Sequence, residues 1–354
     1  MVVRELGLIR FRNYENLFTG FADRLNVFFG KNGQGKTNLL EAIYLVTHLE
    51  SFRTRKIVPL IERPHDLSQV QAVIVKDDRD WKTRIDLTRQ GKKVWLDDTS
   101  VSKVSYYIAL FFSLVFNGDF LYQFRQFPAE RRAFFDRYLS FIDPGYLMGI
   151  KDMRVILSQK NKLLKTGDSG SLSDWNHLLI EKGYAIIAKR REAIEAICEE
   201  LERIFPRVSG RRGRLEIAYR PSLDGPPEAW AEALARAEPR ERQLGHALVG
   251  PHRDDFRLRL DDGRQDDHFS QGEFRICFLA LLLSMNAWLD SIRKVRPVLI
   301  LDDLFSELDR GVQKTLMSYL AGLPNQIFVT TTEWTEGFCP SDAAVREIRR
   351  GRIV

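Results

Sequence analysis

Segment 30–37, which reads GKNGQGKT, constrains this chain more than any other part of it. It matches the phosphate-binding pattern G-x-x-x-x-G-K-[ST] in full. Its glycines let successive backbone amides point into one concavity, and a following helix adds unpaired amides and the positive end of its dipole. LNVFF (25–29) predicts a buried strand before the loop, and NLLEAIYLV (38–46) predicts an amphipathic helix after it. These flanks favour a nucleotide site over a glycine-rich turn without a ligand.

The polar groups of this segment have separate expected roles. We expect Lys36 to face solvent and to reach the β- and γ-phosphates of ATP, and we expect the Thr37 hydroxyl to ligate Mg²⁺. The candidate nucleotide-binding residues here are Gly30, Lys31, Asn32, Gly33, Gln34, Gly35, Lys36 and Thr37.

A second apolar run, VLILDD (298–303), provides the acidic partner that a P-loop requires. Ligands bind at the carboxyl ends of strands in open α/β sheets, which is where two acids after a buried strand would lie. We expect Asp302 to hold Mg²⁺ through water and Asp303 to act as the catalytic group that polarises the attacking water. The alternative is an acidic strand end or a helix cap.

The stretch SQGEFR (270–275) precedes a long apolar helix and predicts a second anion-binding helix start at Ser270 and Gly272. Alone, such a turn is often only a helix cap. Its position before the acidic strand gives the order P-loop, inserted segment, S-x-G-[QE] and hydrophobic strand with two acids. This is the order found in ABC-type ATPases.

The chain alternates between two kinds of pattern. Residues 1–110 and 245–354 carry strand-like runs, whereas residues 111–244 carry helical periodicity, including a predicted helix over 175–205. We therefore predict an α/β fold in which an ABC-type P-loop ATPase head, formed by both ends of the chain, contains an inserted helical lobe. That lobe is too short to form a long coiled-coil arm.

Charge is unevenly distributed along the chain. The net charge is +6, and residues 120–214 carry 18 Lys and Arg but 12 Asp and Glu. Within them, RVSGRRGR (207–214) has four arginines and no acid. Such a stretch favours a polyanion such as nucleic acid, and the alternative is a solvated loop tip. The chain has no run of 18 apolar residues, no apolar signal region near residue 1 and only widely spaced cysteines, so we expect a cytoplasmic protein that does not span a membrane.

Eight stretches of the sequence resemble the RecF family of DNA replication and repair proteins, which are relatives of the SMC and Rad50 ATPases. GPHRDDF, within the fifth of these stretches, is more specific than the P-loop. The stretches are FRNYENL (11–17), GKNGQGKTNLLEAI (30–43), SFRTRK (51–56), FPAERRAFFD (127–136), LVGPHRDDF (248–256), FSQGEFR (269–275), VLILDDLFSELD (298–309) and QIFVTTT (326–332).

The resemblance implies an ATP-dependent homodimer in which the P-loop of one subunit faces the helix at Ser270 and Gly272 of the other. It also implies binding to double-stranded or gapped DNA, slow ATP hydrolysis, and work with RecR and RecO to place recombinase on gapped DNA during recombinational repair. The candidate DNA contacts are Arg211, Arg212 and Arg214. Arg131 and Arg132 could line a DNA cleft, or could pair with acids on their own helix.

Some positions depart from the family pattern or keep two interpretations. Residues 118–120 read Gly-Asp-Phe where the family has Pro-Glu-Asp, and Glu273 replaces the usual glutamine beside the second anion site. Segment 252–255, His-Arg-Asp-Asp, is either a structural turn or part of the site.

Four other classes of protein compete with this interpretation. Another SMC/Rad50-like DNA-clamping ATPase would share the same motifs. An ABC transporter subunit is disfavoured because Gly35 and Ser270 are 235 positions apart. A nuclease or primase would need more convergent acids than Asp302 and Asp303. A clamp that uses ATP only as a slow switch differs from an ATPase motor in its hydrolysis rate.

Overall fold

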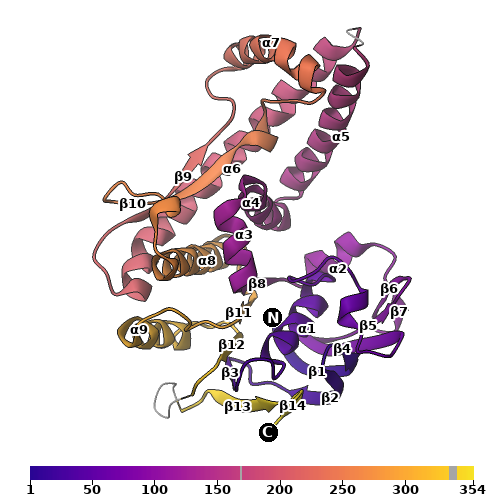
Figure 1. Cartoon of the computed structure of the whole chain (residues 1–354), viewed down its shortest axis with the longest axis vertical. Helices are drawn as coiled ribbons and strands as arrows, with labels where there is room; N and C mark the ends of the chain where they lie inside the picture. The colour runs from indigo at the N-terminus through magenta and orange to yellow at the C-terminus, as the bar shows by residue number, and fades with distance from the viewer. Residues whose placement is uncertain (168–169, 335–340) are drawn as a thin grey trace. The chain divides into compact units, whose positions relative to one another are not determined.

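The computed structural model describes residues 1–167, 170–334 and 341–354, which form two compact units (Figure 1). The first unit contains residues 1–121, 206–211 and 278–354, and the second contains residues 122–205 and 212–277. The domain limits predicted from the sequence assign residues 245–277 to the C-terminal part of the head, whereas these residues belong to the second unit. The domain limits at 110 and 244 stay a prediction.

A mainly parallel sheet forms one layer of the first unit, in the order β14-β13-β3-β12-β11-β8. Three neighbouring strands, β8, β11 and β12, are short, mainly apolar and fully buried, as expected when both faces of a parallel sheet are covered. β3 pairs with β12 and β13, and β12 lies between β3 and β11. The strands are β3 (Leu25–Phe29), β8 (Ser113–Phe116), β11 (Val298–Leu301), β12 (Ile327–Thr331), β13 (Ala344–Arg349) and β14 (Arg352–Ile353).

An antiparallel sheet forms the second layer of the first unit, in the order β2-β1-β4-β5-β6-β7. Its strands alternate between buried and exposed residues, which is the pattern of a sheet with one face on the core. The strands are β1 (Val2–Phe11), β2 (Tyr14–Gly20), β4 (Leu67–Lys76), β5 (Arg79–Thr88), β6 (Gly91–Leu96) and β7 (Thr99–Ser100).

The core of the first unit joins both sheets to helix α1 (Lys36–His48). Leu40 and Ile43 of α1 are fully buried with Val70 of the antiparallel sheet and Phe28 of the parallel sheet. The P-loop helix is thus fixed by packing on both sides. Remaining helices of this unit are η1 (Val58–Leu60), α2 (Val104–Leu110) and α9 (Arg310–Ala321).

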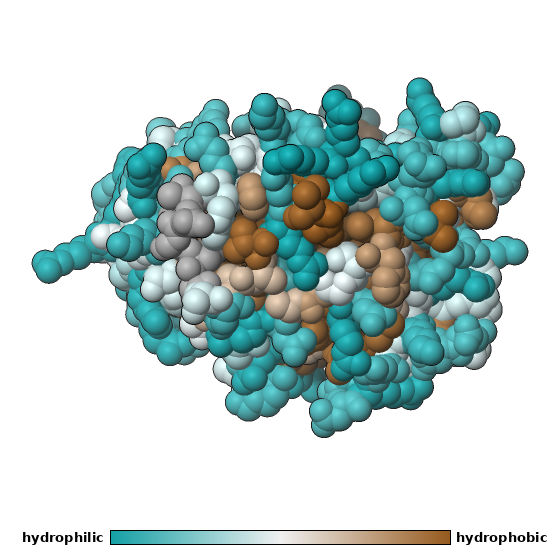
Figure 2. All heavy atoms as spheres, turned by 90° about the horizontal axis from the view of Figure 1, so that it is seen from below, coloured by the Kyte–Doolittle hydropathy of each residue, from teal (hydrophilic) through white to brown (hydrophobic). Residues whose placement is uncertain are grey.

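The surface of the first unit also exposes some apolar side chains. Phe18 on β2 is 73% exposed and Val354 is 71% exposed. Figure 2 shows hydrophobic side chains gathered near the middle of the face seen from below, where Figure 1 places β2, β13 and β14.

Helix α8 (Gln271–Arg293) starts in the second unit and continues into the first. It is long and apolar enough to cross a membrane by length and composition, but 78% of its most apolar window is buried in the structure. This burial identifies it as a core helix.

The second unit combines helices with two antiparallel strands. The predicted helix over 175–205 is confirmed and is longer, because α6 spans Leu172–Ser209 and ends in the first unit. β9 (Leu215–Arg220) pairs with β10 (Asp255–Leu260), so the inserted part is not purely helical. The other helices are α3 (Gly118–Gln126), which begins in the first unit, α4 (Pro128–Ile142), α5 (Pro144–Thr166), α7 (Pro227–Leu244), η2 (Pro251–Arg253) and η3 (Asp266–His268).

A buried charge network in the second unit explains the segment 252–255. The Arg190 guanidinium on α6 donates to Asp254 at 2.6 Å and to Asp136 on α4 at 2.8 Å. Tyr219 on β9 also donates to Asp254, which is fully buried. Arg131 is equally buried and pairs with Asp255 at 2.7 Å rather than with acids of its own helix. The segment is therefore a structural turn, and Arg131 is not placed to contact DNA.

Candidate nucleotide site

The P-loop joins the end of β3 to the start of α1 and requires glycine at two positions. A Cβ on Gly30 would lie 2.5 Å from the Ile348 carbonyl oxygen, and one on Gly35 would lie 2.6 Å from Asn13 Nδ2. Both glycines also have positive φ, at 144° and 114°. Gly35 caps α1 without a side-chain hydrogen bond, so the first amides of the helix are left for an anion.

The motif at residues 11–17 braces this loop. Asn13 Nδ2 donates to the Gln34 carbonyl oxygen at 3.1 Å, and the Tyr14 hydroxyl donates to the Gly35 carbonyl oxygen at 3.0 Å. Asn38 donates to Asn13 Oδ1 at 2.7 Å, which ties the first turn of α1 to the same support. Sequence reasoning noted this motif only as part of a resemblance, because its contacts lie about 20 residues away.

Lys36 is buried, so the expectation that it faces solvent is wrong. It is 8% exposed, and its ammonium group donates to the carbonyl oxygens of Gly30 at 2.5 Å and Lys31 at 3.0 Å. Burial lowers the pKa of Lys36, while the nearby charges of Asp302 and Asp303 oppose that shift. The ammonium group of Lys36 is therefore held by carbonyl groups of the P-loop, the same loop whose amides would bind a phosphate.

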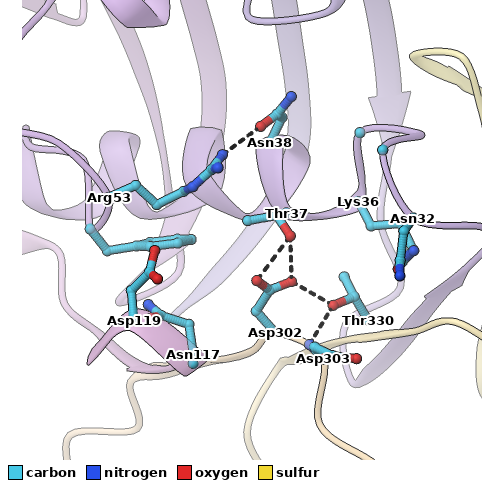
Figure 3. A pocket seen from close by; sticks show the side chains of 14 residues that line it. Asn32, Lys36, Thr37, Asn38, Arg53, Asn117, Asp119, Asp302, Asp303 and Thr330 are labelled. Carbon is cyan, nitrogen blue, oxygen red and sulfur yellow. Dashed lines mark hydrogen bonds between the residues drawn. The ribbon is translucent and has the colours of Figure 1, made fainter. Parts of the chain in front are cut away.

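Both acids after β11 lie beside the P-loop, as predicted (Figure 3). Thr37 Oγ1 lies 3.0 and 2.9 Å from the two carboxylate oxygens of Asp302 and donates to that group. Thr330, at the end of β12, donates to Asp302 Oδ1 at 2.6 Å and accepts from the backbone N–H of Asp303 at 2.8 Å. Asp303 itself has φ of 50°, a conformation that few residues with a side chain adopt. One hydroxyl thus positions both acids.

The opposite wall of the cavity contains residues that sequence reasoning did not propose for the site. The cavity has a volume of about 440 Å³, and Arg53, Asn117 and Asp119 line it together with the P-loop and the two acids. Arg53 Nη1 donates to Asn38 Oδ1 at 2.9 Å. Asn117 is 3% exposed, and its Oδ1 accepts from the Phe120 amide at the start of α3. The SFRTRK stretch was the only available signal for Arg53.

Glu41 on α1 anchors the loop that carries Arg53. It is fully buried and receives two hydrogen bonds from the Arg12 guanidinium, at 2.8 and 2.6 Å. The Ser51 hydroxyl donates to it at 2.5 Å, and Arg53 lies 3.7 Å from it. A buried carboxylate needs such partners, so this pairing fixes the approach of Arg53 to the cavity.

The residues present fit a hard divalent cation. Hydroxyl and carboxylate oxygens from Thr37 and Asp302 converge, and Mg²⁺ prefers oxygen ligands of which the protein supplies only one or two. Burial raises the pKa of Asp302 despite the hydrogen bonds from Thr330 and Thr37. Within the described parts of the chain, no group of three or more His, Cys, Asp or Glu residues forms a separate metal cluster.

The other predicted site residues lie elsewhere in the chain. Ser270 and Gly272 belong to the second unit, whereas the P-loop and both acids belong to the first. Of the predicted DNA contacts, Arg211 lies in the first unit, and Arg212 and Arg214 lie in the second. All three are exposed, and Arg214 pairs with Glu202 at 2.5 Å. Their role stays a prediction.

The fold and the site define an ATPase head of the ABC type. They combine a parallel sheet, a P-loop after β3, and two acids at the end of β11, which lies two strands from β3 in the sheet. The RecF/RecN/SMC N terminal domain family matches residues 2–338. A DNA replication and repair protein RecF from Geotalea uraniireducens (strain Rf4) is 35% identical over 339 residues, which are 94% of this chain and 93% of that protein. The chain belongs to the RecF family of DNA replication and repair proteins.

Solved structures agree with this membership. The structure of the recombination mediator protein RecF-ATP in the RecFOR pathway is similar with a TM-score of 0.84 and 26% identity, covering 99% of this chain and 98% of that one. An Smc head bound to the C-winged helix domain of ScpA has a TM-score of 0.63 at 17% identity, covering 100% of this chain and 97% of that one. The second likeness concerns the fold alone. The RecF relatives favour a repair protein over a transporter subunit.

Proposed function

We propose that this protein binds ATP with Mg²⁺ in the cavity of the first unit and uses it as a switch for DNA binding. The observation that carries the proposal is the convergence of Lys36, Thr37 and the two acids on one cavity, with Thr330 linking Asp302 to Asp303. A RecF relative of known structure is described with ATP, which supports the choice of nucleotide.

Each residue of the cavity has a distinct part in this proposal. The α1 amides and Lys36 bind the phosphates, and Lys36 exchanges its two carbonyl partners for phosphate oxygens. Thr37 and Asp302 would hold Mg²⁺, which when bound supplies positive charge that offsets the charge of the phosphates. Asp303, held by Thr330, accepts a proton from the attacking water. Arg53 adds a cation on the opposite wall.

Two subunits would share each nucleotide. The P-loop of one chain would face the start of α8, at Ser270 and Gly272, of a second copy, so the γ-phosphate joins the two copies. Hydrolysis removes that charge and releases the dimer. We further propose that the dimer binds double-stranded or gapped DNA in the cytoplasm, and that it works with mediators of the RecR and RecO type to place recombinase on gaps.

Steady-state hydrolysis with and without gapped DNA tests the switch. We expect slow turnover that requires Mg²⁺ and rises with DNA, and we expect Asp302→Asn to lose most of the Mg²⁺-dependent turnover. Activity of Asp302→Asn equal to that of the parent would mean that another group holds the ion.

The salt dependence of DNA binding tests the predicted contacts. Neutralising Arg211, Arg212 and Arg214 should reduce the slope of log K against log salt by about 2.7, since each phosphate contact contributes about 0.9. The matched control neutralises three arginines of α7, which are Arg236, Arg240 and Arg242. Equal slopes for the two variants would identify segment 211–214 as a solvated surface.

A further inference from the structure

The start of α8 is closed by a reciprocal pair of hydrogen bonds. Glu273 Oε2 accepts from the backbone N–H of Ser270 at 3.0 Å, and Ser270 Oγ accepts from the backbone N–H of Glu273 at 3.2 Å. This is a capping box, in which each side chain satisfies the other residue's backbone donor. Glu273 therefore stabilises the start of α8, which is the proposed binding site for a phosphate.

The same carboxylate opposes an anion at this position. A phosphate that binds Ser270 competes with Glu273 for the Ser270 N–H, and two negative charges at that distance repel. The side chain of Glu273 is only 17% exposed, so water screens this repulsion incompletely. The usual glutamine would form the same capping box without the charge.

A nearby cation can neutralise the charge of Glu273. Arg264, in the turn after β10, lies 3.3 Å from Glu273 Oε2. Asp262 fixes that arginine, because it accepts from the Arg264 side chain at 2.7 Å and from the Arg264 backbone N–H at 2.9 Å. Arg264 is thus bound firmly to Asp262 and more loosely to Glu273. Because its contact with Glu273 is the longer one, Arg264 has room to approach the Glu273 carboxylate more closely.

We propose that Arg264 and Glu273 are a pair of positioning residues for the phosphate bound at Ser270, an inference that rests on the proposed function. When the phosphate of a nucleotide on a second copy reaches Ser270, Glu273 leaves the Ser270 N–H and turns to Arg264. Before the phosphate binds, Glu273 caps the helix start. After Glu273 has turned to Arg264, the arginine neutralises its carboxylate and the Ser270 N–H can bind the phosphate. The presence of glutamate at 273 then depends on arginine at 264.

Dimerisation driven by ATPγS and Mg²⁺, measured by sedimentation velocity on the full chain, tests this pair. Arg264→Ala should weaken the dimer about three- to tenfold, because the carboxylate is no longer neutralised. Glu273→Gln should leave the dimer as strong as the parent or make it stronger. Arg264→Ala placed in the Glu273→Gln chain should stay within about twofold of Glu273→Gln alone. Arg264→Lys should recover part of the loss.

The control replaces Arg259, which lies on β10, the strand before the turn that carries Arg264, and pairs with Glu216 on β9, and it should change dimerisation less than about twofold. Equal weakening by Arg264→Ala in both backgrounds would overturn the proposal, because Arg264 would then act directly on the phosphate or partner. Unchanged dimerisation in Arg264→Ala would overturn it too. Failure of the proposed function looks different, since the parent itself would not dimerise and Ser270→Arg would have no effect.

Discussion

Replacing Thr330 with valine removes one hydroxyl from the centre of the nucleotide site and preserves the shape of the side chain. Thr330 is fully buried, and its hydroxyl donates to Asp302 at 2.6 Å and accepts from the Asp303 N–H at 2.8 Å. A hydrogen bond to a charged group contributes about 1.5–3 kcal/mol and one between neutral groups about 1 kcal/mol. We therefore expect the free energy of unfolding to fall by about 2.5–4 kcal/mol.

The same change should slow ATP hydrolysis more than it weakens ATP binding. Asp303 loses the anchor of its backbone, whereas Lys36 and the α1 amides keep their positions. Urea unfolding measures the stability, and single-turnover hydrolysis with a separate binding titration divides the two effects. The control is Thr331→Val; the Thr331 hydroxyl donates to the Glu333 carbonyl oxygen, and its loss should cost about 1 kcal/mol. Equal stability of the two variants, with hydrolysis unchanged in Thr330→Val, would refute the linking role of this hydroxyl.

Three further changes test other parts of the molecule. Asp303→Asn should bind ATP normally and hydrolyse it about 10²-fold more slowly, as a rate assay at saturating ATP would reveal; an unchanged rate would move the base to another residue. Lys36→Ala and Ser270→Arg should each prevent ATP-driven dimerisation, and mixing them should restore some dimer through one intact site; no recovery by sedimentation, with both chains folded, would contradict a shared site. Burial lowers the pKa of His252 from 6.5 to about 4. Between these two pH values the unfolded chain binds a proton that the folded chain does not, so stability is lost as pH falls from 6.5 towards 4. His252→Gln should remove about 2 kcal/mol of the loss between pH 7 and pH 5 in urea unfolding, and an unaltered pH dependence would exclude this histidine as its source.

The nucleotide site was predictable where the chemistry is local in sequence. Eight consecutive residues specify the P-loop, because phosphate binding needs glycines, a lysine and a hydroxyl in that order. Asp302 and Asp303 follow an apolar run, and the parallel sheet brings that strand end to the P-loop through β12. The rule that ligands bind at the carboxyl ends of such strands was sufficient for this part.

Long-range partners could not be predicted in the same way. Arg190 joins Asp136 and Asp254 across 54 and 64 residues, and no periodicity specifies such a pairing. The alternatives for Arg131 on its own helix were chemically sound, yet burial selected Asp255, 124 residues away. Lys36 was expected in solvent because composition says nothing of the two carbonyl groups that surround it. Each case depends on which surfaces the fold brings together.

The pairing of β3 has a consequence for how the chain is made. β3 ends at the P-loop, but its two neighbours in the sheet are β12 and β13, and Asn26 meets Phe328 and Ala344 there. A ribosome that adds about 5–20 residues per second needs about 15–60 s to make the intervening segment. During that time the apolar strand LNVFF has neither neighbour and is exposed to misfolding and to chaperones. The nucleotide loop is therefore synthesised well before the strands that complete its part of the sheet.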